Sequence, residues 1–333
     1  MMSMMWARAI LLSTLFLSAV GFTTMINPVS SMRGQISMVA MKKKETPAKP
    51  AREPQPEPGP GSAAVPLFPY GIASFKMIIE ENRFWSDKTM YIKELERVSN
   101  HIKIWRPRRF GKSLLCDMLE QYYDKANSKT QRDALFGQTE MMTTTPPATT
   151  YHMGKYLVLR LSFSSVPAHR DVEKDFNTYI DNAVRKFSKK YYKAGLLNMP
   201  IEINTEDALS SLRRLFDEVE RAGEQIHLIV DECDSFPVEF SSSLSMVTDL
   251  TFEPAFAGMF GLTKDDVVRG LHRIGHLTEQ QRIDFLEQMR EQYDGYRFVR
   301  TQKKAVYNPQ YVHYFLNHLD RLGVPPESLI DSA

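Results

Sequence analysis

The sequence predicts an α/β fold in which a parallel sheet is covered by helices on both faces. Apolar runs of strand length alternate with amphipathic helices, a pattern typical of parallel sheets between helical layers. A strand predicted at 156–163 is followed by helices predicted at 171–192 and 206–221, and then by a strand at 226–230. A further amphipathic helix at 283–293 indicates a small helical C-terminal region.

The bulk composition is that of an ordinary globular protein. Of the 333 residues, 43% are hydrophobic and 25% are charged, and the formal net charge is +2. This small charge argues against nucleic-acid binding driven by bulk charge. The two cysteines, Cys116 and Cys233, cannot form a disulfide framework, and their spacing is not that of a zinc site.

The N-terminus, residues 1–22, is predicted to be a signal or targeting segment. Arg8 is its only charge, residues 9–22 are uncharged, and small residues at 19–21 suit a cleavage site. We expect a protein of the secretory pathway or a secreted one. A mitochondrial or plastid location is the alternative, because no acidic residue precedes Glu45.

Residues 23–66 are predicted to be a disordered linker, because Pro, Lys and Glu dominate 42–66 and cannot bury enough apolar surface to fold. The folded domain is expected at 67–320, followed by a tail at 321–333. Within the domain, the polar stretch 128–151 is rich in Thr and Pro and is predicted to be a surface excursion.

The stretch 102–124 has the layout of a phosphate-binding loop, or Walker A motif. An apolar strand leads into a basic turn, Gly111-Lys112-Ser113 closes the turn, and an amphipathic helix follows. The helix N-terminus offers N–H groups to a polyphosphate, Lys112 can reach the phosphates, and the Ser113 hydroxyl can ligate Mg²⁺. Arg106 stands where the general pattern has its first glycine. A basic turn that caps an ordinary helix is the alternative.

A second element of the same chemistry lies at the end of the strand predicted at 226–230. Asp231 and Glu232 follow this apolar run directly, in the form of a Walker B segment. Ligands of parallel sheets bind at the carboxyl ends of the strands. We expect Asp231 to hold the metal and Glu232 to act as general base for an attacking water. An acidic pair that opens a surface loop is the alternative.

In the order of its motifs, the chain resembles the AAA-ATPase-like proteins, which are P-loop NTPases often fused to a C-terminal nuclease-like domain of the PD-D/E-x-K superfamily. The motifs are Gly71-Ile72 with Phe75, Asp87-Lys88-Thr89, Arg106 to Ser113, Val230 to Asp234, Phe260 to Thr263, Tyr293 to Phe298 and Tyr307-Asn308-Pro309. The resemblance implies a three-layer P-loop domain, and it implies ATP as the nucleotide. It also makes Arg106 the family's own form of the loop.

The phosphate-binding loop, the acidic strand end and the family resemblance together predict the residues of the site. The predicted nucleotide contacts are Arg106, Arg109, Gly111, Lys112 and Ser113. The predicted Mg²⁺ ligands are Ser113 and Asp231, and the predicted catalytic residues are Glu232 and Lys112. The nucleotide is the expected partner. Nucleic acid enters only by family analogy, and no transmembrane segment is expected apart from an N-terminal signal anchor.

Two departures from the family pattern concern the end of the chain and the segment after Asp234. In the family, helices and a further strand with a polar sensor residue follow the acidic strand, and we expect this block to be missing here. We also expect the nuclease-like domain to be absent. The predicted function is Mg²⁺-dependent ATP binding with weak or absent hydrolysis. The alternatives are a non-catalytic nucleotide-binding or interaction module and a truncated product of a defective gene model.

Three residues near the C-terminus are given structural roles. Thr263 is expected to cap a helix that begins at Lys264, although the segment faintly resembles a guanine-reading motif. His313 and His318 are expected to be surface or core residues and not ligands.

Overall fold

The structure is a computed structural model, and it describes residues 22–28, 67–165, 172–205, 207–232 and 247–328. The predicted targeting segment therefore lies outside the described residues up to residue 21. Most of the predicted linker, at 29–66, also lies outside them.

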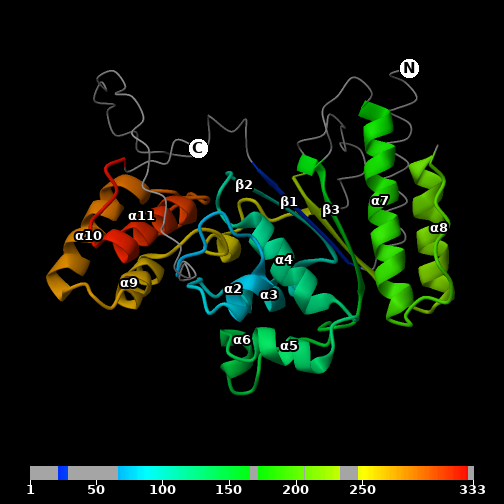
Figure 1. The fold of residues 1–333 in the computed structure, drawn as a ribbon, viewed down its shortest axis with the longest axis horizontal. Helices are drawn as coiled ribbons and strands as arrows, with labels where there is room; N and C mark the ends of the chain where they lie inside the picture. The colour runs from blue at the N-terminus through cyan, green and yellow to red at the C-terminus, as the bar shows by residue number, and fades with distance from the viewer. Residues whose placement is uncertain (1–21, 29–66, 166–171, 206, 233–246, 329–333) are drawn as a thin grey trace, which may run out of the picture.

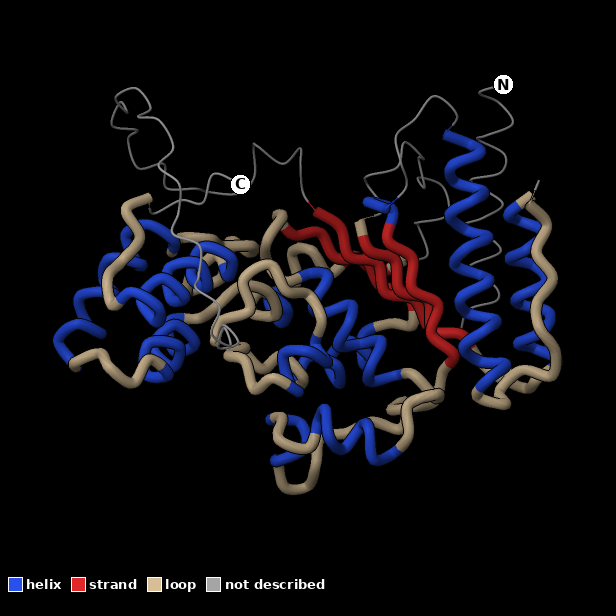
Figure 2. The backbone as a smooth tube through the Cα atoms, in the orientation of Figure 1, coloured by secondary structure: helices blue, strands red, loops and turns tan. Residues whose placement is uncertain are grey.

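A parallel five-stranded sheet of order β3-β4-β1-β2-β5 forms the centre of the fold (Figures 1 and 2). Each neighbouring pair in this sheet is parallel, as the alternation of strands and helices predicts. The strands are β1 (Phe22–Pro28), β2 (His101–Arg106), β3 (Leu157–Ser162), β4 (Ile226–Asp231) and β5 (Thr248–Asp249).

The middle strand, β1, corrects the prediction that residues 23–66 are a disordered linker. Residues 23–28 pair with β2 on one side, and residues 22–26 pair with β4 on the other. Phe, Thr and Ile favour strands, and β1 fills a gap that would leave two ladders of backbone groups unpaired. The sheet is therefore continuous from the strand before the loop to the acidic strand.

Helices cover both faces of the sheet (Figure 1). The side chains of β3 alternate between two hydrophobic cores: Leu159 packs in the core with α7 and α8, and Val158 packs in the core with α4. The helices on the α4 side are α2 (Phe75–Glu80), α3 (Met90–Val98), α4 (Lys112–Tyr123), α5 (Lys129–Phe136) and α6 (Glu140–Thr143). On the opposite side are α7 (Val172–Lys193) and α8 (Ala208–Arg221), and short 3₁₀ turns occupy Phe163–Ser165 and Pro254–Phe256.

The stretch 128–151 is not the plain surface excursion that its polar composition predicts, because it holds α5 and α6. Ser128 and Gln131 form a capping box that starts α5. Phe136 and Met141 are fully buried in the core that contains α4. A few well-placed apolar side chains therefore anchor a segment whose overall composition is polar.

The C-terminal helices form a third hydrophobic core with two aromatic residues from the start of the domain. Phe68 and Phe84 pack among the side chains of α9 (Lys264–Arg273), α10 (Glu279–Tyr293) and α11 (Pro309–Leu322). Thr263 caps α9, as the sequence predicts. This third core fixes the start of α11 beside residues 68–70.

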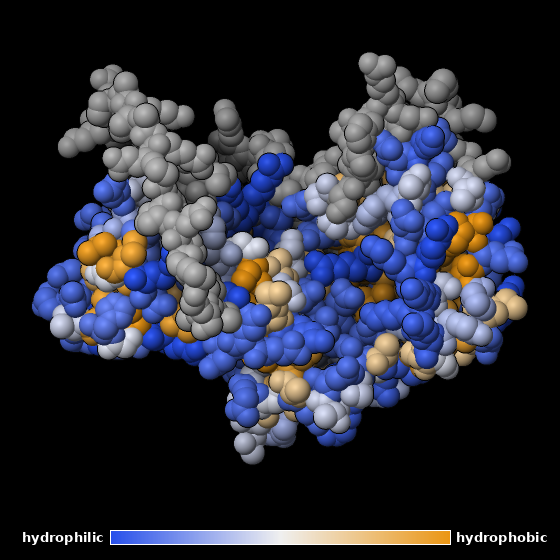
Figure 3. Space-filling view, in the orientation of Figure 1, coloured by the Kyte–Doolittle hydropathy of each residue, from blue (hydrophilic) through white to orange (hydrophobic). Residues whose placement is uncertain are grey.

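Hydrophilic side chains cover most of the face shown in Figure 3, and the hydrophobic residues there lie in separate small groups. Within the described ranges, no helix combines the length and apolar character that crossing a membrane requires.

Candidate nucleotide-binding site

The loop between β2 and α4 is shaped by two residues in left-handed backbone conformations. Gly111, the N-cap of α4, has φ 84°, and Arg109 has φ 70°. A side chain at a left-handed position costs about 1–3 kcal/mol, and such strain is concentrated at functional sites. The loop leads into the N-terminus of α4. At a helix N-terminus, free N–H groups and the helix dipole favour the binding of an anion.

Lys112 lies inside this loop. Its side chain is buried, and its Nζ donates a hydrogen bond to the carbonyl oxygen of Pro107 at 3.0 Å. The ammonium group is thus held against the loop backbone, in the place where the sequence predicts contact with phosphate oxygens.

Ser113 and Asp231 meet where α4 begins and β4 ends. The Ser113 side chain lies beside the Asp231 carboxylate and lowers the pKa of that carboxyl. Asp231 is only 2% exposed, and its Oδ1 has no hydrogen-bond partner among the residues that the structure describes. Burial raises the pKa of Asp231, while the Ser113 side chain and the charge of Arg160 oppose this shift. A buried carboxylate oxygen without a partner is costly, so the pair is suited to a cation.

The two side chains fit Mg²⁺ in particular. Mg²⁺ prefers oxygen ligands and takes only one or two from the protein, with the rest from phosphates and water. No group of three or more His, Cys, Asp or Glu side chains in the described ranges could hold a metal ion. A Mg²⁺ ion would therefore be held by Asp231, Ser113 and the nucleotide itself.

Glu232 follows Asp231 at φ 53°, a third left-handed conformation in this region. Its half-buried side chain lines the same cleft as Lys112 and Ser113. The predicted general base, Glu232, therefore lies in the same cleft as the predicted phosphate contacts. Its left-handed backbone conformation is strained, which costs free energy.

Arg106 does not take the role that the sequence predicts. Its side chain is 1% exposed, and its guanidinium donates to the carbonyl oxygens of Trp105, Thr251 and Phe256. It also lies 4.6 Å from the ring centre of Phe298. Burial lowers the pKa of Arg106 to about 10. Through these contacts Arg106 stabilises the loop from inside the fold. The prediction that Arg106 contacts the nucleotide is therefore not supported by its position.

Arg160 of β3 is a residue that the sequence analysis missed. Its guanidinium lies 3.1 Å from Asp117, donates to the Ser113 carbonyl oxygen at 3.2 Å and lies 4.0 Å from Asp231. It therefore ties the first turns of α4 to the acidic strand. A single arginine inside an otherwise apolar strand was the available signal.

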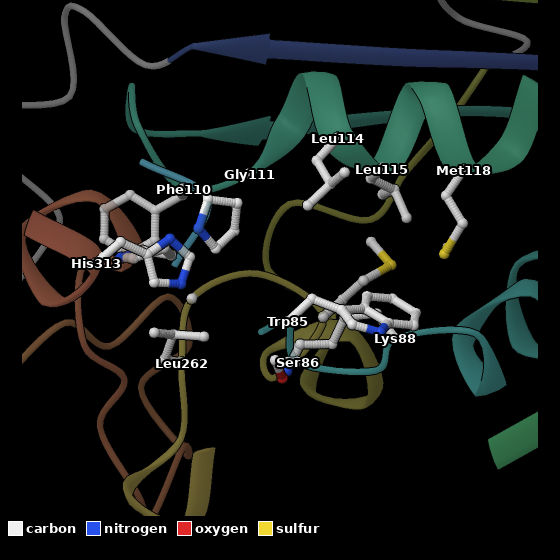
Figure 4. Close-up of a pocket in the computed structure, with 14 residues that line it drawn as sticks. Trp85, Ser86, Lys88, Phe110, Gly111, Leu114, Leu115, Met118, Leu262 and His313 are labelled. Carbon is white, nitrogen blue, oxygen red and sulfur yellow. The ribbon is translucent and has the colours of Figure 1, made fainter. Parts of the chain in front are cut away.

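A cleft of about 330 Å³ extends from the loop toward α11, within the range of small-molecule sites. One end, the phosphate end, is lined by Arg108, Arg109, Gly111, Lys112, Ser113 and Glu232. The other end, the base end, is lined by Pro69, Gly71, Ile72, Ala73, Pro309, Gln310 and His313. A smaller apolar pocket of about 70 Å³ adjoins it beneath Gly111 and Leu114 (Figure 4).

A helix N-terminus beside an acidic strand end is an arrangement that nucleotide-binding α/β proteins use. The family model described as Predicted AAA-ATPase, AAA-ATPase_like, matches residues 69–274, which is more than half of the chain. The chain belongs to this family, as its motifs predict, and membership indicates nucleotide binding. No curated protein and no solved structure matched the chain. Strand β1 lies outside the matched residues.

Proposed function

We propose that the chain binds ATP with Mg²⁺ in this cleft and hydrolyses it slowly or not at all. The observation that carries the proposal is the meeting of Ser113 with Asp231, whose buried Oδ1 has no partner within the described ranges. A structural helix cap would not require an unpaired carboxylate oxygen, whereas a metal site would.

The loop before α4 and the acidic end of β4 have different tasks in the proposed site. The N–H groups at the start of α4 and the Lys112 ammonium bind the β- and γ-phosphates. Ser113 and Asp231 hold Mg²⁺, which supplies charge neutralisation to the phosphate oxygens when bound. The sheet order, with the loop strand and the acidic strand on either side of β1, supports the three-layer P-loop fold.

Slow hydrolysis is proposed because the transition state needs more than a base. Charge spreads over the transferred phosphoryl group, and preorganised donors must meet it. Arg108 and Arg109 line the cleft but are exposed, so water already solvates their charges. The strand between β4 and β2 is β1, which lies outside the residues that the family model matches. The sequence predicts that the family's sensor strand is missing.

Replacement of Lys112 tests the proposal. Lys112→Ala removes a charge-assisted contact, so we expect a loss of about 2 kcal/mol or more in binding, roughly 30-fold, measured by titration with a fluorescent ATP analogue. Lys129→Ala is the matched control, because Lys129 is exposed on α5 and pairs only with Asp133 in the described part of the chain. Equal affinity in the two variants would reject the proposal. Binding that does not respond to Mg²⁺ would favour a non-catalytic module.

A further inference from the structure

A second cavity lies between the end of α2 and α9, and we call it the α2–α9 pocket. Its volume is about 580 Å³, which is larger than the nucleotide cleft and lies within the range of small-molecule sites. Four basic side chains line it: Arg83, Arg269, His272 and Arg273. Among the described residues that line this pocket, none is acidic and none also lines the nucleotide cleft. The α2–α9 pocket is therefore a separate, basic cavity.

Three of these basic side chains come from neighbouring positions of α9. His272 and Arg273 follow Arg269 by three and four residues, a spacing that makes side chains neighbours on a helix surface. The Arg269 side chain is 61% exposed, and His272 and Arg273 are exposed as well. A ligand in the pocket can therefore reach their N–H groups.

The positive charge on this part of α9 is only partly neutralised. Arg269 pairs with Asp266, which also pairs with Lys88 at 3.7 Å, so one carboxylate serves two cations. Arg273 donates a hydrogen bond to the carbonyl oxygen of Asn82 at 2.8 Å, and this partner carries no net charge. An anion in the pocket would complete the neutralisation through charge-assisted hydrogen bonds.

The wall formed by α2 and the turn after it combines apolar side chains with two amides. Ile78 and Phe84 are buried, and Trp85 is half-buried and also lines the small apolar pocket of Figure 4. Asn82 and Gln138 are exposed and supply amide groups. Asn82 lies just after α2 at φ 49°, a left-handed conformation that asparagine tolerates. Apolar walls beside arginines suit a ligand with an apolar body and an anionic group.

We propose that the α2–α9 pocket binds a small organic phosphate, in which a phosphate monoester is attached to an apolar or aromatic body. A phosphate monoester carries a charge of about −1.5 to −2 at neutral pH and has three acceptor oxygens. The planar guanidinium groups of Arg269 and Arg273 can each donate two parallel hydrogen bonds to it. A carboxylate has a single charge and two oxygens, so it matches this pocket less well. Binding here requires no nucleotide in the cleft.

Phenyl phosphate is the probe, and phenol and benzoate are its two controls. Phenol lacks the anionic group, whereas benzoate carries a carboxylate in its place. Titration calorimetry measures the affinities, and the fluorescence of Trp85 reports where the probe binds. We expect phenyl phosphate to bind about tenfold or more tightly than phenol, and about fivefold more tightly than benzoate. Trp85→Phe should remove the fluorescence change and alter the affinity by less than about threefold.

Substitutions on α9 test whether the probe binds in this pocket. Arg269→Gln and Arg273→Gln should each weaken phenyl phosphate binding by about tenfold, because a charge-assisted contact is lost. Both side chains are exposed, so we expect both variants to keep the wild-type melting temperature. Arg290→Gln is the matched control and should bind as the wild type does. Arg290 is exposed on α10 and pairs with Glu287 three residues before it, as Arg269 pairs with Asp266.

Lys112→Ala separates this pocket from the nucleotide cleft, and it should leave phenyl phosphate binding unchanged. Loss of probe binding in Lys112→Ala, with binding kept in Arg269→Gln and Arg273→Gln, would overturn the proposal, because the probe would then bind in the cleft. Equal affinities for phenyl phosphate and benzoate would also overturn it. So would a chain that binds no phenyl phosphate but binds a single-stranded oligonucleotide through the two arginines. Arginine-dependent probe binding in a chain that binds no ATP would reject the proposed function alone.

Discussion

The phosphate end and the base end of the cleft are built in different ways. Lys112 and Ser113 are neighbours in one turn of the chain. The groups that these two side chains contact lie at the carboxyl ends of two strands of the same sheet. The base end joins residues 69–73 to the first turns of α11, which are more than 200 residues away along the chain. The phosphate end is thus set by local backbone, whereas the base end depends on how a separate helical core docks.

Deletion of β1 should have the largest effect and should break the phosphate end. A chain that starts at Phe22 keeps β1, whereas a chain that starts at residue 29 loses it and exposes the edges of β2 and β4. We expect the first chain to fold and bind nucleotide. The second should lose its cooperative melting transition and its binding, as followed by circular dichroism and titration.

A point substitution isolates β1 from the rest of the N-terminus. Thr24→Pro removes one backbone donor in a strand that is paired on both sides, which a central strand does not tolerate. Ala51→Pro is the control, because it adds a proline to a stretch already rich in proline. Identical melting temperatures for the two variants would show that β1 is not part of the folded sheet.

A substitution inside the C-terminal core should disrupt the base end of the cleft. A Cβ at Gly270 would lie 2.8 Å from Leu316 Cδ1 and 3.5 Å from Phe84, both of which are buried. Gly270→Val should therefore destabilise the chain by about 2 kcal/mol through overpacking. It should also weaken ATP binding more than tripolyphosphate binding, because only ATP uses the base end. Gly275→Val is the control, since a Cβ there meets nothing within 4 Å. Equal weakening of both ligands would show that the two ends are not separable.

The contrast between the two ends also decides what the sequence can predict. The strand, loop and helix around Lys112 follow from local periodicity, and the acidic strand end at Asp231 follows from the same logic. The role of Arg106 could not be predicted, because its carbonyl partners at Thr251 and Phe256 lie about 150 residues away. An arginine in a basic loop gives no sign that it is buried.

His313 is buried, one of the two positions that the sequence predicts for it, but its place at the cleft was not predicted, and strand β1 was missed for the same reason. A run of Phe, Thr and Ile behind an uncharged segment has the composition of a leader, and only pairing with β2 and β4 makes it a strand. His313 lies on an amphipathic helix where either a core or a surface position was consistent with the pattern. Its position in the cleft depends on the contact between α11 and Pro69. Non-local pairings of this kind leave no periodic signal.

A smaller effect is expected from Asp231→Asn, which sharpens the metal assignment within the phosphate end. The amide removes a negative charge from the metal site, so we expect a loss of about 1.4 kcal/mol, tenfold, in the Mg²⁺-dependent part of ATP binding. Titrations with and without Mg²⁺ measure this part directly. Asp133→Asn is the control, because Asp133 is an exposed residue of α5.

The stability of the same variant should move in the opposite direction. Burial raises the pKa of Asp231, so the folded chain without metal holds its proton more tightly than the unfolded chain does. The ionised carboxylate is therefore a net cost at neutral pH, and that cost is relieved as the pH falls through the raised pKa. We expect Asp231→Asn to melt at an equal or higher temperature than the wild type at neutral pH without Mg²⁺. A clear decrease would indicate that the carboxylate is a structural group.

The smallest effect is expected for Glu232→Gln, and it separates an enzyme from a binder. Glu232 lines the phosphate end and can place a water, but one base cannot stabilise the charge that develops on the phosphoryl oxygens. Loss of a single preorganised donor typically costs about 3 kcal/mol, a hundredfold or more in rate. Because β1, which lies outside the residues that the family model matches, is the strand between β4 and β2, we expect low turnover that Glu232→Gln lowers by less than about twofold.

Steady-state phosphate release at saturating ATP and Mg²⁺ measures this turnover. Asn27→Ala serves as a second arm, because β1 brings Asn27 to the carboxyl end of the sheet, in register with Trp105. If β1 merely completes the sheet, this variant should also leave the rate unchanged. Turnover of roughly one per second, abolished by Glu232→Gln, would be that of an ordinary enzyme and would contradict the proposal of slow hydrolysis. A parallel loss in Asn27→Ala would then show that β1 contributes to turnover as well as to the sheet.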